Sequence, residues 1–255
     1  MRTDIQIVIP SRKRSDQINK VLQLFPSAVV WVHENEAYDY TLAAPLIKIK
    51  THTRVDGIWA IRKEIIQRTD ARIVVLLDDD ITLVRYYAGD GSKPVNIKDP
   101  IHIEALIENT ALMADDLGLE LFAWSRDRML QAFNPCRPFE VVYPCATAFG
   151  IIGKKCLPDE KFKTGGDIDL TMQALQNSRI VFVDKRYFFD NGQVGKGKGG
   201  LQGLRTSAIE NETSKMLSVK WGKYVYRGKS KCKCKMGGMA MSIRVERKNK
   251  LASTK

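Results

Sequence analysis

Three consecutive carboxylates, Asp78, Asp79 and Asp80, directly follow the five apolar residues 73–77. Each charge in such a cluster raises the cost of ionising its neighbours, so a folded chain that gathers them must compensate them. A divalent cation does this readily, and oxygen ligands at this density suit Mg²⁺ or Mn²⁺. The triplet therefore predicts a hard-metal site. The alternative is an acidic turn that caps the following segment.

Residues 164–170 carry a second constellation, Thr-Gly-Gly-Asp-Ile-Asp-Leu. The two glycines allow close approach of another backbone, and Asp167 and Asp169 follow two positions apart. A carboxylate here could accept the proton of a hydroxyl substrate as a general base. At the N-terminus of a helix the same two residues would serve equally well as caps.

A third stretch, residues 190–200, has five glycines between positions 192 and 200, together with Lys196 and Lys198. Backbone N–H groups and lysines in such a loop could fold over a diphosphate. A linker is the alternative. The stretch has no Walker A pattern, so the chemistry of P-loop NTPases is not supported.

The apolar spacing predicts the elements that must position these groups. Strands alternate with helices early in the chain, and strands and loops prevail later, which favours an α/β domain with a mixed sheet and with ligand chemistry at one edge. The expected strands are 5–9, 28–32, 46–49, 73–77, 121–124, 141–152 and 180–183, and the expected helices are 16–25 (capped by Ser15 or Asp16), 56–68, 101–117 and 167–175. Residues 86–100 and 125–138 are expected to be loops.

The charge is concentrated at the C-terminal end. Of the formal net charge of +12, residues 220–255 carry +11, from twelve Lys or Arg and one acid. Such asymmetry indicates a polyanionic partner, with nucleic acid first and an anionic membrane second. We therefore expect a domain over residues 1–200 and a basic C-terminal segment over 201–255. A basic tail that only improves solubility is the alternative.

Composition excludes several other classes of protein. The 255 residues are 44% hydrophobic, which fits one globular domain with an appendage. No apolar run reaches the length of a membrane span, and the N-terminus is typical of a strand and not of a signal peptide. The five cysteines include no CxxC pair, so a reducing, cytoplasmic compartment is expected.

Taken in order, these features resemble the GT-A glycosyltransferases, enzymes with a Rossmann-type mixed sheet flanked by helices that use nucleotide-sugar donors. The resemblance covers about residues 5–190. Ile-Pro-Ser-Arg at 9–12 is similar to the first strand and nucleotide-binding loop of that fold. Asp78–Asp80 resembles its DxD motif, and Gly166-Asp167-Ile168-Asp169 resembles the acidic motif that supplies the base in inverting members.

The resemblance implies roles for individual residues. Asp167 is the base by register, with Asp169 as the alternative, and Gly166 stands where the family usually has its first acid. Many relatives supply a late histidine to the metal, but the last histidine here is His102, so Asp190, Asn191 or a water would substitute. Mn²⁺ or Mg²⁺ would be held by Asp80, Asp78 and Asp190. The donor, a UDP-sugar such as UDP-glucose, would meet Pro10, Ser11, Arg12, Arg14, Glu34, Arg62, Asp78, Asp79, Lys196 and Lys198.

Within that fold, the compact size, the glycine-lysine loop and the basic tail are most similar to the phage TET-associated glycosyltransferases. That resemblance implies hexose transfer to 5-hydroxymethylcytosine in DNA, in the cytoplasm of a bacterial host. The DNA-contacting residues would be Lys220, Trp221, Lys223, Tyr224, Arg227, Lys229, Lys231, Lys233 and Lys235.

Three alternatives stay open at this point. The first is a GT-A transferase that acts on a protein, lipid or glycan. The second is a sugar-phosphate nucleotidyltransferase, although residues 10–14 lack the glycine-rich start usual there. The third is a non-catalytic nucleic-acid-binding module.

Overall fold

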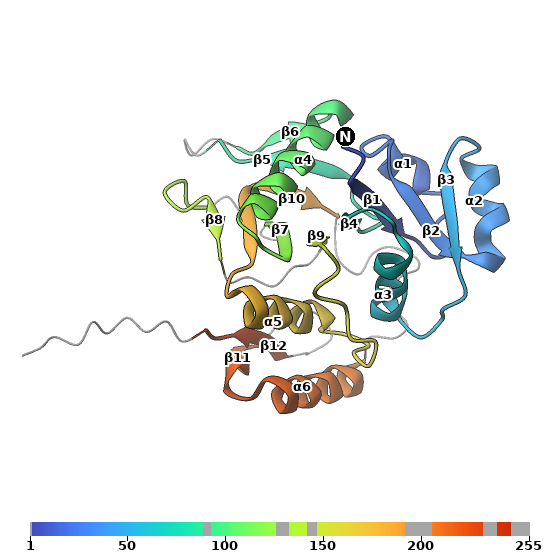
Figure 1. The fold of residues 1–255 in the computed structure, drawn as a ribbon. Coiled ribbons are helices and arrows are strands. Elements are labelled where there is room, and N and C mark those ends of the chain that lie inside the picture. The colour runs from blue at the N-terminus through green and yellow to red at the C-terminus, as the bar shows by residue number, and fades with distance from the viewer. Residues whose placement is uncertain are drawn as a thin grey trace, which may run out of the picture.

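The computed structural model describes residues 2–88, 93–125, 133–141, 147–191, 206–231 and 239–245. Their main element is a mixed sheet of ten strands in the order β3-β2-β1-β4-β9-β7-β10-β5-β6, with β8 pairing β10 at the side (Figure 1). These strands are β1 Ile5–Pro10, β2 Val29–His33, β3 Lys48–His52, β4 Ile73–Leu77, β5 Leu83–Tyr86, β6 Val95–Ile97, β7 Leu121–Ser125, β8 Phe139–Glu140, β9 Ala148–Ile152 and β10 Phe182–Asp190.

Helices cover both faces of this sheet and follow the alternation of its side chains (Figure 1). Helices α1, α2 and α4 share one apolar cluster with Ile5, Ile7 and Ile9 of β1, and α3, α5 and α6 share the other with Val8. The described helices are α1 Ile18–Leu22, η1 Glu34–Glu36, α2 Ala37–Ala43, α3 Ile58–Arg68, α4 Pro100–Asp116, α5 Gly166–Ser178, α6 Ser207–Trp221 and η3 Gly222–Tyr224.

The order of the parallel strands creates a switch point beside β1. The chain adds β2 and then β3 on one side of β1, and then crosses over through α3 to add β4 on the other side. Strand β4 is buried at all five positions, as the continuous apolar run at 73–77 predicts. The carboxyl ends of β1 and β4 therefore open the crevice in which open α/β sheets bind their ligands.

Several predicted boundaries were wrong. The stretch 86–100, expected to be a loop, contains β6 and the end of β5, a short antiparallel pair at the edge of the sheet. Helix α1 is shorter than expected and is preceded by Gln17, whose side chain makes no capping hydrogen bond, so neither Ser15 nor Asp16 is the cap. The strand expected over 141–152 begins only at Ala148, and residues 142–146 lie outside the described part.

The C-terminal segment packs on the rest of the chain over part of its length. Leu217 of α6 and Val225 of the hairpin formed by β11 Val225–Lys231 and β12 Met239–Ile243 lie in the same apolar cluster as α3 and α5. Figure 1 shows α6 and this hairpin beside α5. Leu217 and Val225 therefore belong to the core, although they fall within residues 201–255, the segment that the charge pattern sets apart.

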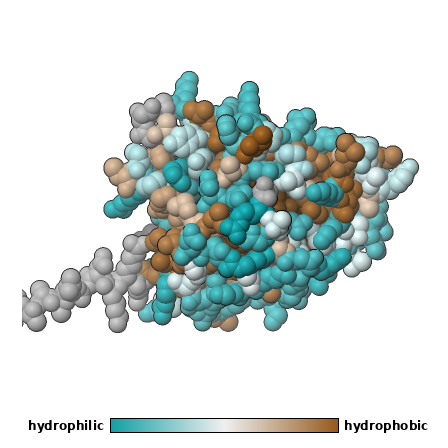
Figure 2. Space-filling view, turned by 45° about the horizontal axis from the view of Figure 1, so that its top comes forward, coloured by the Kyte–Doolittle hydropathy of each residue, from teal (hydrophilic) through white to brown (hydrophobic). Residues whose placement is uncertain are grey.

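The surface gives no sign of a membrane span. Figure 2 shows hydrophilic side chains over most of the face in view, with small groups of hydrophobic ones among them. No helix in the described part of the chain combines the length and the apolar character needed to cross a bilayer.

Gly150 in the middle of β9 provides a test of the packing in the sheet. A Cβ atom at this position would lie 2.0 Å from Cζ of Phe122, so alanine would push into an aromatic ring on β7. We expect Gly150→Ala to lower the free energy of unfolding by about 1–3 kcal/mol through overpacking. Chemical denaturation measures this. Adding Phe122→Leu should recover part of the loss, and an unchanged midpoint in Gly150→Ala would contradict the packing described.

Candidate active site at the carboxyl ends of β1 and β4

The loop after β1 and the acidic triplet after β4 meet at the switch point. Ser11 is buried, and its Oγ donates a 2.6 Å hydrogen bond to Asp79. Arg14 contacts Asp79 and lies 3.2 Å from Oδ2 of Asp80. Tyr40 of α2 supports this loop, because its hydroxyl lies 2.7 Å from Ser11 Oγ and accepts from the Arg14 amide at 3.0 Å. Asp79 is therefore occupied in holding the two loops together.

Asp78 has its own cationic partner. Arg62 donates from Nη2 to its Oδ1 at 2.5 Å, and the guanidinium stacks on the rings of Trp59 and Phe149 at 4.7 and 5.3 Å from their centroids. Cation–π contact of this kind suits a desolvated guanidinium. The pKa of Asp78 is nevertheless raised to about 7, because burial, together with the charges of Asp79 and Asp80, outweighs the effect of Arg62.

Two arginines from different elements thus compensate the triplet, which the sequence had indicated would need a cation. Three carboxylates with Arg14 and Arg62 leave one formal negative charge. Oδ1 of Asp80 is buried and has no hydrogen-bond partner in the structure. This oxygen and the carboxylate of Asp78 have the hard-ligand chemistry of a Mg²⁺ or Mn²⁺ site. Within the described residues, however, no three His, Cys, Asp or Glu side chains are grouped so as to hold a metal.

Asp190, the third predicted metal ligand, is engaged elsewhere. It is buried at the end of β10 and forms an ion pair with Arg85, 3.3 Å away. Its backbone carbonyl also accepts a hydrogen bond from the amide of Thr82. Because no group of three metal-binding side chains exists in the described part, Asp190 does not complete a preformed site with Asp78 and Asp80.

The acidic motif of residues 164–170 lies at the start of α5. A Cβ atom on Gly166 would lie 2.5 Å from the ring of Trp59, so the backbone of α5 rests directly on this indole. This explains why glycine occupies position 166. Trp59 also stacks on Arg62, so it connects the start of α5 to the partner of Asp78. Asp167 lies in the first turn of α5 and is partly exposed.

Asp169, the alternative base, has a different environment from Asp167. It is fully buried, and its Oδ1 accepts a 2.8 Å hydrogen bond from Nε1 of Trp221 and lies 2.8 Å from Nζ of Lys220. Its Oδ2 accepts from Gln173 at 2.8 Å. All of these contacts are made by a carboxylate that is fully buried, whereas Asp167 is partly exposed. Lys220 and Trp221, predicted to lie at a DNA surface, thus both contact a buried carboxylate, and Lys220 itself is exposed.

The remaining predicted residues are distributed around this centre. Pro10 ends β1, Arg12 is exposed in the loop after it, and Glu34 is exposed at the end of β2. Lys223 lies over the ring of the exposed Tyr224. Arg227, Lys229 and Lys231 lie on β11. Lys196, Lys198, Lys233 and Lys235 lie outside the described residues.

Tyr40 and Trp59 also take part in these contacts, although neither is among the residues predicted for the site. Burial raises the pKa of Tyr40 to about 12, so its hydroxyl keeps its proton while it supports the loop after β1. Tyr40 could not have been found, because it approaches Ser11 only through the fold. Trp59 could have been identified from the sequence, because it precedes Arg62 by three residues and so lies on the same helix face.

Comparisons with known proteins support the fold. No protein-family model and no curated protein matches the sequence. Among solved structures, residues 1–349 of S. aureus TarS in complex with UDP match with a TM-score of 0.51 at 12% identity, over 85% of this chain and 64% of that one. A mannosyltransferase from Pyrobaculum calidifontis, in complex with GDP-Man and Mn²⁺, matches with a TM-score of 0.48 at 10% identity, over 72% and 57%.

The chain therefore spans less than two thirds of the length of these solved chains. The match to TarS shows a shared fold. Together with the strand order and the helices on both faces, it gives the chain a GT-A-like α/β fold. The expectation for the fold class is confirmed.

Replacing Arg14 tests the role of arginine as a counterion. We expect Arg14→Met to lower the free energy of unfolding by about 3 kcal/mol, because Asp79 and Asp80 lose a largely buried partner. Mn²⁺ should then raise the melting temperature of Arg14→Met more than that of the wild type, since the freed carboxylates attract the ion more strongly. The exposed Lys20→Met is the control. Equal responses to Mn²⁺ would contradict the role of Arg14.

The raised pKa of Asp78 predicts a pH dependence of stability. Between about pH 4 and 7 the folded chain keeps a proton on Asp78 that the unfolded chain has lost. The free energy of unfolding should therefore fall as pH rises through this range, by at most ~1.4 kcal/mol per unit, and level off above about pH 7. Denaturation of wild type and Asp78→Asn from pH 4.5 to 8 measures this. As pH rises to about 7, the wild-type curve should fall progressively relative to that of Asp78→Asn, which has no proton to lose at this position. Parallel curves would contradict the prediction.

Proposed function

We propose that the protein is a glycosyltransferase that moves a sugar from a nucleotide-diphosphate donor to a hydroxyl group. The observation that carries this proposal is the meeting of the loop after β1 with Asp78–Asp80 at the switch point, where Asp80 presents a buried, unpartnered oxygen. Crevices at such points are where open α/β sheets bind nucleotides. The TarS structure that shares the fold was solved with UDP, which favours a UDP-sugar as the donor.

The chain would hold the donor from both sides of the crevice. Pro10, Ser11, Arg12, Arg14 and Glu34 belong to the nucleotide side. Asp79 holds the loop after β1 in place through Ser11 and Arg14. Arg62 sets the position of Asp78, and Lys196 and Lys198 are the proposed cations of the glycine-lysine loop.

The chemistry assigns one step to Asp167. Its carboxylate takes the proton of the acceptor hydroxyl as that oxygen forms a bond to the anomeric carbon. The bond from this carbon to the diphosphate oxygen breaks, and the nucleoside diphosphate leaves with the electron pair. A Mn²⁺ or Mg²⁺ held by Asp80 and Asp78 would supply Lewis-acid stabilisation of the leaving group.

For the acceptor we propose 5-hydroxymethylcytosine in DNA, which a bacteriophage enzyme would meet in the host cytoplasm. The charge supports a polyanion, because residues 220–255 carry nearly all of the net charge. Tyr224 and Tyr226 are each more than 40% exposed beside Lys223, and aromatic rings among cations suit stacking on bases. A base in a duplex would have to be flipped out to reach Asp167. A protein, lipid or glycan hydroxyl is the alternative acceptor.

The donor chemistry is tested with two variants of the proposed machinery. We expect Asp80→Asn and Asp167→Asn each to lower kcat for sugar transfer at least about 100-fold, since each removes a group used in the reaction. Incubation with a panel of nucleotide sugars, followed by mass spectrometry of the products, measures transfer. Asp70→Asn, an exposed carboxylate after α3, is the matched control. Full activity of both variants would overturn the assignment.

The acceptor is tested in the same assay with hydroxymethylated and unmodified DNA. Transfer to the hydroxymethylated DNA alone supports the proposed acceptor. DNA binding should also weaken steeply with salt and on replacing Lys223 and Tyr224 together. Transfer only to a glycan, lipid or protein would refute the DNA acceptor and leave the transferase in place.

A further inference from the structure

The start of α5 is enclosed between two helices that are far apart in the sequence. Gly166 rests on the indole of Trp59 from α3. On the α6 side, a Cβ atom on Gly165 would lie 2.9 Å from Cγ2 of Thr213. The Oγ1 atoms of Thr164 and Thr213 are 3.0 Å apart. The two glycines therefore mark a place where the backbone leading to Asp167 is packed from both sides.

The contacts of α6 with Gly165 and Asp169 come from one face of that helix. Thr213, Leu217, Lys220 and Trp221 are spaced at intervals of four, three and one residues, which places them on one stripe of a helix. Thr213 and Leu217 line Gly165, and the last two residues hold Asp169. The end of α6 is thus anchored to the carboxylate two positions after Asp167.

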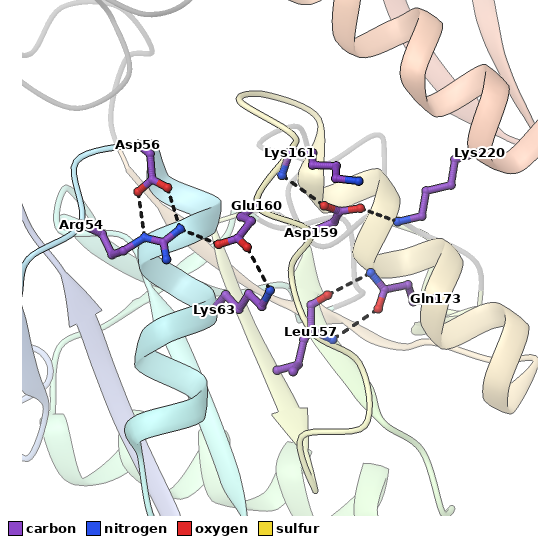
Figure 3. A network of polar contacts seen from close by, with 9 residues as sticks. All are labelled: Arg54, Asp56, Lys63, Leu157, Asp159, Glu160, Lys161, Gln173 and Lys220. Atoms are coloured by element: carbon purple, nitrogen blue, oxygen red, sulfur yellow. Dashed lines mark hydrogen bonds and ion pairs between the residues drawn. The ribbon is translucent and has the colours of Figure 1, made fainter.

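The anchor extends into a network of ion pairs. Lys220 also contacts Asp159 at 2.9 Å, in the loop that leads to α5 (Figure 3). The next residue, Glu160, contacts Arg54 and Lys63, which come from the segment before α3 and from α3 itself (Figure 3). The loop around Asp159 and Glu160 therefore connects α6 to α3.

Asp169 depends on this anchor. It is fully buried, and Lys220 is its cationic partner at 2.8 Å, so removal of that lysine leaves a buried carboxylate without charge compensation. Trp221 adds a directed N–H donor on the same oxygen, and Gln173 satisfies the other one. Loss of Lys220 or Trp221 would therefore remove a contact that holds Asp169, two positions after Asp167 in the sequence.

We propose that Lys220 and Trp221 are positioning residues, which hold Asp169 and thereby fix the first turn of α5 with Asp167 in its working orientation. This inference rests on the proposed function for what Asp167 does. It makes α6 a structural part of the transfer site, in addition to any contact of the C-terminal segment with the acceptor.

The first test measures backbone order and needs no activity. We expect amides 167–172 to exchange hydrogen about tenfold faster in Lys220→Met and in Trp221→Phe than in the wild type. Trp221→Phe keeps an aromatic ring and removes only the N–H donor, so it is the milder change. The control is Lys215→Met, an exposed lysine of α6 outside the stripe. Unchanged exchange in both variants, with melting temperatures equal to the control, would overturn the proposal.

The second test separates positioning from binding. Lys220→Met and Trp221→Phe should lower kcat about tenfold while the KM for the donor stays within about twofold, and Lys220→Arg should restore most of kcat. A loss confined to KM, or no rescue by arginine, would contradict a positioning role. If the wild type transfers no sugar from any donor, the proposed function fails, and the exchange measurement still decides whether α6 orders α5.

Discussion

Three carboxylates at the end of β4 have to share a small volume with the end of β1, and their mutual repulsion is the constraint on which the site depends. Arg14 comes from the loop after β1 and Arg62 from α3, so the two compensating charges come from two different elements. Each arginine is itself fixed, the first beside Tyr40 and the second on Trp59. The charge balance therefore sets the relative positions of the loop, the strand and the helix.

The second constraint is steric. Gly165 and Gly166 allow α3 and α6 to approach the start of α5 more closely than any side chain would permit. Trp59 belongs to both constraints, because one indole supports Arg62 and also touches Gly166. The acidic triplet and the acidic motif of α5 are almost ninety residues apart in the sequence. The ring of Trp59 connects them, because it contacts both Arg62, the partner of Asp78, and Gly166.

Much of this arrangement follows from the sequence. The apolar run at 73–77 predicted a fully buried strand, and the alternation of elements predicted the α/β fold. The sequence also indicated that the negative charge of Asp78–Asp80 must be compensated, but it did not indicate that Arg14 and Arg62 provide the compensation. Charge counting cannot distinguish a metal from arginines that only the fold brings near. Contacts that only the fold brings about were also missed in the C-terminal segment, where Lys220 and Trp221 were predicted only as part of a basic surface. Composition gave no sign that one stripe of α6 faces Asp169.

The contact between Asp169 and Trp221 joins residues 52 positions apart in the sequence. During synthesis, α5 leaves the ribosome well before α6, so for that interval Asp169 has neither its lysine nor its indole. A buried carboxylate is stable only once these arrive, and the first turn of α5 cannot settle on Trp59 in its final form before then. The nascent chain would therefore complete the loop after β1 and the triplet after β4 early, and would acquire an ordered Asp167 only after α6 has been synthesised.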